Sequence, residues 1–387
     1  MVARTGLEVL IREHRELVRG RRIGLVTHAA AVRSDMVHAL DALIALEVGI
    51  GALFGPEHGL DGAVADGAAI ADARHPRTGM PIYSLYGEEK APSAAVLQDI
   101  DALVFDMQDV GVRFYTFIST LYYVLKSAAE TGTPVIVLDR PNPIGGVTVE
   151  GPILDPAYTS FVGIAPIPIR YGLTMGELAQ YINNEMGLSA DLTVIPMQGW
   201  RRDMWFEDTG LHWVPTSPAM PHPSTTVCYP GTCLLEGTNL SEGRGTALPF
   251  EICGAPWIDG HALAAHLNAR GLEGVIFRPA RFVPGSPSRY EGAYCGGVQI
   301  HVMDRERFRP VSVGLHLIAA VRTLCPDEFA WRAQSWEGGH PHFDLLTGSA
   351  HVRRALESGV DVDALVEGWA DDLMEWQEIR RPYLFYS

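Results

Sequence analysis

Short apolar runs that alternate with helical segments restrict the fold of this chain most strongly. Four such runs are expected to form strands, at residues 22–27, 48–54, 101–106 and 134–138. Apolar side chains at helical spacing lie between them, at residues 35–46 and most clearly at residues 115–129. Strands that are apolar on both faces and separated by helices form a parallel sheet covered on both sides. The first half of the chain therefore predicts an α/β fold.

The pattern becomes regular again in the last third of the chain. The expected elements are helices at 259–270, 311–324 and 361–378 and strands at 274–278 and 296–303. With 387 residues, the chain is long enough for two domains. We predict an α/β catalytic domain over residues 1–255, which includes a Pro/Gly-rich active-site region, and a smaller α+β domain over residues 256–387.

The charge of the chain excludes some classes of partner. Its formal net charge is −16, whereas nucleic acids and anionic membranes require a basic surface. No run approaches the roughly 20 apolar residues of a membrane span. The N-terminus mixes charged and apolar residues and lacks the apolar core of a signal peptide. The five scattered cysteines form no CxxC pair and suggest reduced thiols. We therefore expect a cytoplasmic protein without nucleic-acid or membrane partners. Secretion is the alternative if a signal peptide precedes this sequence, and the oligomeric state stays open.

One run in the middle of the chain, EGTNLSEGRGT (236–246), is the strongest candidate for a ligand site. It has no helical or strand period, so we expect a loop, and its flanks are apolar and aromatic. Its glycines allow close approach of backbone to a ligand, and polar groups on a held loop often bind ligands. The alternative is an ordinary turn-rich connection. The candidate residues are Glu236, Asn239, Ser241, Glu242 and Arg244.

Polar residues also follow three of the four expected strands, where ligands of parallel sheets bind. The second strand ends in GPEHG (55–59), which would place Glu57 for general acid catalysis. The alternative for Glu57 is a cap on the next segment. His58 could ligate a metal, but the chain has no HExxH, HxH or paired cysteines. A structural or hydrogen-bonding role for His58 is therefore favoured, and no metal site is expected.

The third strand leads into FDMQDVGVRFYT (105–116). One aspartate there could cap the next helix, but the run holds more polar groups than a cap requires. Arg113 is expected to pair with an aspartate and so position another side chain, and Tyr115 either binds a ligand or packs. The candidates in this run are Asp106, Gln108, Asp109, Arg113 and Tyr115.

The fourth strand leads into DRPNPIGG (139–146), where two prolines stiffen a loop that carries Asp139, Arg140 and Asn142. Further along, Arg170 and Tyr171 precede a helix, and Arg170 could anchor an anionic group through a bidentate contact. The chain contains neither a Walker loop nor a GxGxxG run after the first strand. We therefore expect no nucleotide cofactor, and indeed no cofactor of any kind.

Five motifs in the same order resemble a known family: GPEHG, FDMQDVGVRFYT, DRPNPIGG, SFVGIAPIPIRYGLTMGELA and YPGTCLLEGTNLSEGRGTALPFEICGAPW. Together they resemble the bacterial exo-β-N-acetylmuramidase family, formerly a family of unknown function, over nearly the whole chain. The resemblance implies a Rossmann-like domain joined to a smaller domain, with the active site in the cleft between them. It also implies a glycoside hydrolase that releases terminal β-1,4-linked N-acetylmuramic acid from the non-reducing end of peptidoglycan fragments. The substrate would be a muropeptide or a peptidoglycan-derived disaccharide.

The resemblance also implies roles for residues. Glu57, at the matching position of GPEHG, is expected to protonate the leaving oxygen. The second catalytic group stays open among Glu236, Glu242, Asp106 and Asp109. The substrate's own acetamido group is a further alternative, so a retaining, an inverting and a substrate-assisted mechanism all stay open. The lactyl carboxylate of muramic acid needs a cation, for which Arg140, Arg170 and Arg244 are candidates. The other polar residues of the motifs are expected to bind substrate: His58, Gln108, Arg113, Tyr115, Asp139, Asn142, Tyr171, Asn239 and Ser241.

Two other functions stay open. The first is a different hydrolase on the same scaffold, for instance a metal-assisted one that uses His58, Asp106 and Asp109. The second is a non-catalytic protein that binds cell-wall sugars. The density of acidic groups argues against the second, because a pure binder needs no proton donor at Glu57.

Overall fold

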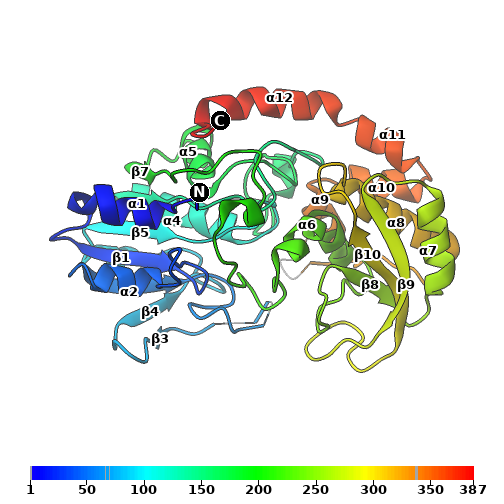
Figure 1. The fold of residues 1–387 in the computed structure, drawn as a ribbon, viewed down its shortest axis with the longest axis horizontal. Helices are drawn as coiled ribbons and strands as arrows, with labels where there is room; N and C mark the ends of the chain where they lie inside the picture. Colours follow the sequence, from blue (N-terminus) through cyan, green and yellow to red (C-terminus); the bar gives the residue numbers. More distant parts are fainter. Residues whose placement is uncertain (1, 66, 69, 336–338) are drawn as a thin grey trace.

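The computed structural model describes residues 2–65, 67–68, 70–335 and 339–387, which form two lobes (Figure 1). The first lobe is built on a seven-stranded sheet with the order β3-β4-β2-β1-β5-β6-β7. All neighbours are parallel except β3 and β4. The α/β prediction is thereby confirmed. The strands are β1 Arg22–Thr27, β2 Gly49–Gly55, β3 Ala73–Arg74, β4 Pro81–Ser84, β5 Ala102–Asp106, β6 Val135–Leu138 and β7 Leu192–Ile195.

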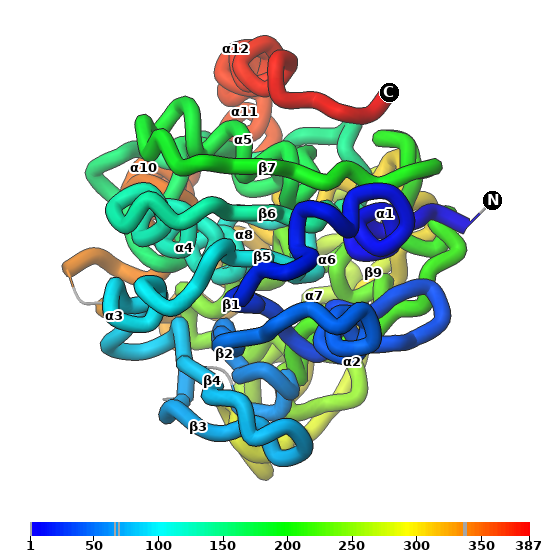
Figure 2. The backbone as a smooth tube through the Cα atoms, turned by 90° about the vertical axis from the view of Figure 1, so that its left-hand side faces the viewer, coloured from blue at the N-terminus to red at the C-terminus, as the bar shows by residue number. Residues whose placement is uncertain are grey.

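Helices cover both faces of this sheet, which explains why its central strands are apolar throughout (Figure 2). The strand β5 is buried at every position, because one face packs against α1 and α2 and the other against α3, α4 and α5. Burial of each large apolar side chain contributes about 1.5–3 kcal/mol. The helices are α1 Gly6–Glu13, α2 Ala39–Ile44, α3 Ala94–Leu97, α4 Phe117–Thr131 and α5 Met175–Glu185.

The second lobe contains a small antiparallel sheet with the order β8-β10-β9. Its last helix, α12, returns over the first lobe (Figure 1), where Trp376 Nε1 donates to the carbonyl oxygen of Tyr171 at 2.9 Å. The domain boundary that we predict after residue 255 falls at the end of β8, and it stays a prediction. The elements are α6 Pro223–Thr232, β8 Ile252–Ala255, α7 Gly260–Ala269, β9 Val275–Phe282, β10 Cys295–Val302, α8 Pro310–Leu324, α9 His342–Thr347, α10 His351–Glu357, α11 Val362–Glu367 and α12 Ala370–Arg380.

Some predicted elements differ in length from those observed. The last predicted helix is two helices, α11 and α12, separated by Gly368 and Trp369. The short strands β3, β4 and β7 were not predicted, because most of their residues are exposed or only partly buried and they lack a long apolar run. Among the helices of the described residues, none has the length and apolar character needed to cross a membrane.

Candidate active site

A pocket of about 460 Å³ lies where the two lobes meet. The first lobe lines it with residues that follow β2 and β5, in agreement with the rule that ligands bind at the carboxyl ends of parallel strands. The second lobe contributes the region after α6 and the β9–β10 loop, residues 283–294. The polar and charged lining residues include Glu57, His58, Tyr115, Thr116, Ser217, Glu236, Glu242, Arg244, Ser288, Arg289 and Arg332.

On the first-lobe side, Glu57 is held by a hydrogen bond to each carboxylate oxygen. The Thr116 hydroxyl donates to Oε2 at 2.7 Å and the Gly67 amide donates to Oε1 at 3.1 Å. The tight turn after β2 presents Glu57 to the cavity because the next residue, His58, adopts the left-handed conformation with φ 72°. Few non-glycine residues adopt this conformation. These contacts fix the direction of a carboxyl group that faces the pocket.

Two neighbours of Glu57 are oriented by internal hydrogen bonds. The buried ring of His58 contacts the carbonyl oxygen of Val64 through Nδ1 at 2.8 Å, which ties the turn to the following segment. Tyr115 donates its hydroxyl proton to Thr216 Oγ1 at 2.7 Å, and burial raises the pKa of the Tyr115 phenol. Tyr115 is therefore a neutral wall of the pocket at physiological pH.

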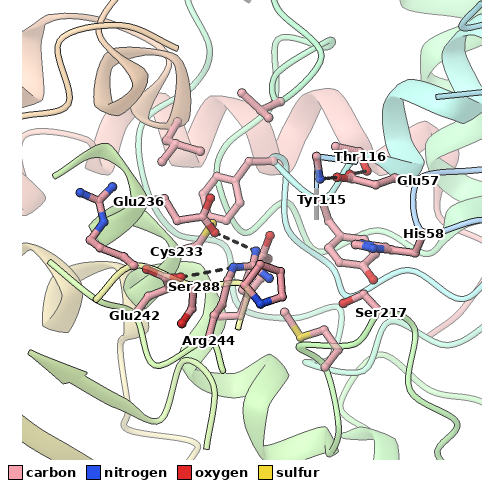
Figure 3. A pocket seen from close by; sticks show the side chains of 18 of the residues that line it. Glu57, His58, Tyr115, Thr116, Ser217, Cys233, Glu236, Glu242, Arg244 and Ser288 are labelled. Carbon is pink, nitrogen blue, oxygen red and sulfur yellow. Dashed lines mark hydrogen bonds and ion pairs between the residues drawn. The ribbon is translucent and has the colours of Figure 1, made fainter. Parts of the chain in front are cut away.

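On the second-lobe side, Arg244 reaches between Glu236 and Glu242 (Figure 3). Its Nη2 lies 2.9 Å from Glu236 Oε1 and its Nε lies 3.3 Å from Glu242 Oε1. Glycines flank Arg244 for a steric reason. A Cβ at position 243 would lie 2.3 Å from the Ile252 carbonyl oxygen, and one at position 245 would lie 2.4 Å from the Gly285 carbonyl oxygen. The GRG run thus allows the loop to pack closely around its arginine. We call Glu57, Glu236 and Glu242 the pocket cluster.

The two glutamates on this side differ in their affinity for protons. Burial, and next the charge of Glu236, raise the pKa of Glu242 to about 7. Burial also acts on Glu236, but the adjacent Arg244 and the buried His342 outweigh it and hold the pKa of Glu236 below its ordinary value. His342 Nε2 lies 4.0 Å from Glu236 Oε2. The site therefore combines an ionised carboxylate with a carboxyl group that can exchange protons near neutral pH.

The aspartates at the strand ends lie elsewhere, in the interior of the first lobe. Asp106 forms a buried bidentate pair with Arg140, with contacts of 2.5 and 3.0 Å. Asp109 accepts a hydrogen bond from the Gly111 amide at 2.6 Å and one from the Tyr171 hydroxyl. Neither aspartate lines the pocket. Although both aspartates lie at the end of a strand, they form contacts within the protein and do not face the pocket.

Asp139 belongs to the same interior network. It accepts hydrogen bonds from the Thr174 hydroxyl at 2.8 Å and the Gly176 amide at 2.7 Å, at the start of α5, and also from the Tyr386 hydroxyl. Burial raises the pKa of Asp139 to about 7. It thus connects the helix to the C-terminal segment. We call Asp106, Asp109 and Asp139 the strand-end cluster.

The remaining residues predicted to bind substrate are also engaged internally. The expected pairing of Arg113 with an aspartate is wrong. Its guanidinium is buried and donates to the carbonyl oxygens of Pro152, Ile167 and Leu346, which join distant loops. Arg170 pairs with the buried Glu150 at 2.9 Å.

Three amide side chains and one hydroxyl complete the set that is engaged within the protein. Each bonds to nearby chain: Gln108 to the carbonyl oxygens of Asp109 and Pro141, Asn142 to that of Leu173, Asn239 to that of Glu328, and Ser241 to the Gly243 amide. The structure therefore brings together in the pocket only Glu57, His58, Tyr115, Glu236, Glu242 and Arg244 of the predicted site residues.

Several pocket residues were missed by the sequence analysis. Thr116 directly follows Tyr115 in its motif, but it coincides with the expected start of the helix and was not singled out for that reason. Arg289 lies in PGSPSRYEG (284–292), a proline- and glycine-rich run between two expected strands. A polar loop of that composition, with a cation beside an aromatic residue, was a usable signal. The aromatic lining residues Tyr86 and Tyr229 carried no local signal, because tyrosine is equally common in cores.

The described residues contain no group of three or more His, Cys, Asp and Glu side chains arranged to hold a metal ion. Of the three residues considered for metal-assisted chemistry, only His58 lines the pocket. Cys233 also lines it, but burial raises the pKa of its thiol well above the ordinary value. A neutral thiol is a poor nucleophile, so the carboxyl groups are the reactive candidates.

The chain matches known proteins over nearly its whole length. The family model described as "Exo-beta-N-acetylmuramidase NamZ, N-terminal" matches residues 23–224, and its C-terminal counterpart matches residues 227–386. The chain is 43% identical over 383 residues to the peptidoglycan beta-N-acetylmuramidase NamZ of Bacillus subtilis (strain 168). This match covers 99% of this chain and 91% of that protein.

Two solved structures of proteins from Bacteroides fragilis NCTC 9343, both described as DUF1343 family proteins, have the same fold. One has a TM-score of 0.91 and 37% identity, and the other a TM-score of 0.79 and 31% identity. Each comparison covers 100% of this chain and 99% of the other. The fold and both family models therefore extend over essentially the whole molecule.

Proposed function

This chain belongs to the exo-β-N-acetylmuramidase family, and we propose that it hydrolyses the β-1,4 bond of a terminal N-acetylmuramic acid at the non-reducing end of peptidoglycan fragments. The observation that carries this proposal is the pocket cluster, in which three carboxyl groups from two lobes line one cavity. The substrate class follows from the relative in Bacillus subtilis, whose name describes a peptidoglycan β-N-acetylmuramidase.

The chemistry of glycosidic cleavage fits this cluster. One carboxyl group protonates the leaving oxygen, and a second group acts at the anomeric carbon or on the attacking water. Glu57 and Glu242 come from opposite sides of the pocket (Figure 3), so a sugar can lie between them. We assign Glu57 to the leaving oxygen and Glu242 to the second role. The pKa of Glu242, raised to about 7, suits a group that gains and loses protons near neutral pH.

Glu236 and Arg244 support this pair. Arg244 contacts Glu236 and Glu242, so the positions of these three side chains depend on one another. The charge of Glu236 is the main electrostatic influence that raises the pKa of Glu242 beyond the effect of burial. We therefore give Glu236 a positioning role, in which it holds Arg244 and tunes Glu242.

A pair of aryl glycosides tests the reaction. The purified protein is incubated with an aryl β-N-acetylmuraminide and with the matching N-acetylglucosaminide, each with and without EDTA. We expect release from the muraminide, little from the glucosaminide, and no effect of EDTA. Inhibition by EDTA would support a metal-assisted hydrolase instead. Binding of the sugar without release from either glycoside, nor from a muramic-acid-terminated disaccharide, would support a non-catalytic binder.

A series of leaving groups tests the two roles. A good leaving group needs no proton donor, so Glu57→Gln should retain activity on a dinitrophenyl muraminide while it loses activity on the natural disaccharide. Glu242→Gln should lose activity on both. Rescue of Glu242→Gln alone by the dinitrophenyl group would exchange the two roles. If the dinitrophenyl group rescued neither variant, neither Glu57 nor Glu242 would be the general acid.

A further inference from the structure

One arginine in the pocket has no carboxylate partner among the described residues. Arg289 lines the cavity from the β9–β10 loop, and its side chain is half-buried. Within the part of the chain that the structure describes, no carboxylate oxygen lies within 4.0 Å of its guanidinium nitrogens and no hydrogen bond engages them. Arg244 differs, because two glutamates already contact it. Arg140 and Arg170 differ further, since both are paired in the interior of the first lobe.

The loop that carries Arg289 is fixed on both sides of this residue. The Gly285 amide donates to the Gly245 carbonyl oxygen at 2.7 Å, and the Tyr290 hydroxyl donates to the Asn239 carbonyl oxygen at 2.7 Å. Both acceptors belong to the loop that also holds Glu242 and Arg244. The backbone at Arg289 is therefore held beside the pocket cluster before any ligand binds, which lowers the entropic cost of a contact with a ligand.

The charge of Arg289 reaches the pocket cluster but is not neutralised within it. It lies close enough to Glu242 to favour the ionised form of that carboxyl group. The other charged groups that line the cavity are Glu57, Glu236, Arg244 and Arg332. Partly buried charges normally have a partner, and a guanidinium matches a carboxylate through two parallel hydrogen bonds. A ligand with a carboxylate would complete this site.

We propose that Arg289 binds the lactyl carboxylate of the terminal N-acetylmuramic acid and is the residue that distinguishes this sugar from N-acetylglucosamine. The inference rests on the proposed function, since it names the contact by which that reaction selects its sugar. It assigns to a residue of the second lobe the anchoring role that the sequence analysis gave to Arg140, Arg170 or Arg244. Arg289 would contact the substrate without taking part in bond cleavage.

The test compares two substrates and two proteins. The substrates are an aryl β-N-acetylmuraminide and its lactyl methyl ester, which has nearly the same size and lacks the charge. The proteins are the full-length wild type and Arg289→Ala. Hydrogen bonds to charged groups lead us to expect a 10- to 100-fold lower kcat/KM for Arg289→Ala on the free acid. On the methyl ester the two proteins should be equal, and Arg289→Lys should be intermediate on the free acid.

Two results would overturn the assignment. An equal loss on the acid and on the ester would mean that Arg289 acts through Glu242 and not on the substrate carboxylate. Wild-type activity of Arg289→Ala on the free acid would mean that the carboxylate binds elsewhere. Arg281→Ala, a matched change at an exposed arginine on the neighbouring strand β9 and outside this pocket, should behave as wild type.

The same experiment separates this inference from the proposed function. A wild-type protein that releases nothing from either aryl muraminide fails the proposed function itself. A wild-type protein that is active but has no preference for the acid over the ester keeps the hydrolase and fails only the anchor. The melting temperature of each variant is measured as a control. A value equal to that of the wild type shows that a loss of activity comes from the site and not from unfolding.

Discussion

Two groups of acidic residues were both site candidates from the sequence, but the structure places them in different surroundings. The strand-end cluster of Asp106, Asp109 and Asp139 lies at or just after the ends of β5 and β6, and its residues are partnered by an arginine, by hydroxyl groups and by amides in the interior. The pocket cluster of Glu57, Glu236 and Glu242 faces a cavity of about 460 Å³. Only the second group lines this cavity. The comparison teaches that a polar residue at a strand end identifies the edge of the sheet where a site lies, but not the residues that act there.

The physical difference lies in what satisfies each charge. An ion pair such as Asp106–Arg140, with 0% and 4% side-chain exposure, is satisfied within the fold, so its removal leaves an uncompensated buried charge. Glu57 is only half-buried and accepts hydrogen bonds from a hydroxyl and an amide. One surface of its carboxyl group remains available to the cavity. The strand-end cluster should therefore affect stability, and the pocket cluster should affect turnover.

The largest expected effect is that of Glu57→Gln on turnover. Loss of a general acid typically costs 10²- to 10⁴-fold, so we expect kcat on a muramic-acid-terminated disaccharide to fall about 10³-fold. The melting temperature should change by no more than about 2 °C, because glutamine can still accept one of the two hydrogen bonds. Kinetics and thermal unfolding of the same preparation check both points. A stable variant with near-wild-type turnover would contradict the role of Glu57.

Asp106→Ala should have the opposite result. It leaves the buried Arg140 without its partner and should lower the free energy of unfolding by about 3–5 kcal/mol. The folded fraction should keep kcat within about threefold of wild type, since Asp106 does not line the pocket. Urea unfolding and the activity of the folded protein provide the two readings. Full stability with lost turnover would place Asp106 in the reaction.

Glu242→Gln should change the dependence of stability on pH. The folded protein raises the pKa of Glu242 from 4.5 to about 7, so this group contributes stability below pH 4.5 that is lost as the pH rises through about 7. Glutamine cannot ionise, so the variant should gain about 2 kcal/mol relative to wild type between about pH 5 and 8. Melting temperatures across this range measure the difference. Parallel curves for the two proteins would show that Glu242 does not titrate there.

Asp109→Asn should have the smallest effect on turnover. Burial raises the pKa of Asp109 to about 6, so its contribution to stability is complete below pH 3.8 and is lost as the pH rises through about 6. The variant should gain about 2 kcal/mol relative to wild type between about pH 4 and 7, which should flatten the stability curve over that range. The pH profile of kcat/KM should keep the ionisation near 7 that we expect from Glu242. A profile without that ionisation would implicate Asp109 in the chemistry.

The sequence was informative about the fold because apolar periodicity is a local signal. The four central strands and the helix after β5 were predicted within one or two residues, since the strands contain continuous apolar runs and the helix buries one apolar face. The helix predicted at 35–46 begins only at Ala39, because Met36 adopts the left-handed conformation with φ 67°. Turn geometry of this kind leaves no periodic trace in a sequence.

The site was harder to predict because it depends on contacts between distant segments. Glu57, Glu236 and Glu242 were identified, but the same reasoning selected Asp106 and Asp109, and nothing in the sequence showed that Arg140 and Tyr171 would occupy these aspartates. Arg289 reaches the pocket only because its loop packs against Gly245. Such packing requires tertiary structure and cannot be read from spacing.

The most direct test of this account is the kcat/KM of Glu57→Gln and Asp109→Asn, measured side by side on a muramic-acid-terminated disaccharide. Each variant replaces one carboxyl group of one cluster with an amide of nearly the same size. We predict that Glu57→Gln loses about 10³-fold and that Asp109→Asn remains within about threefold of wild type. If Asp109→Asn lost activity while Glu57→Gln retained it, the reaction would belong to the strand-end cluster, and the account given for the pocket would be wrong.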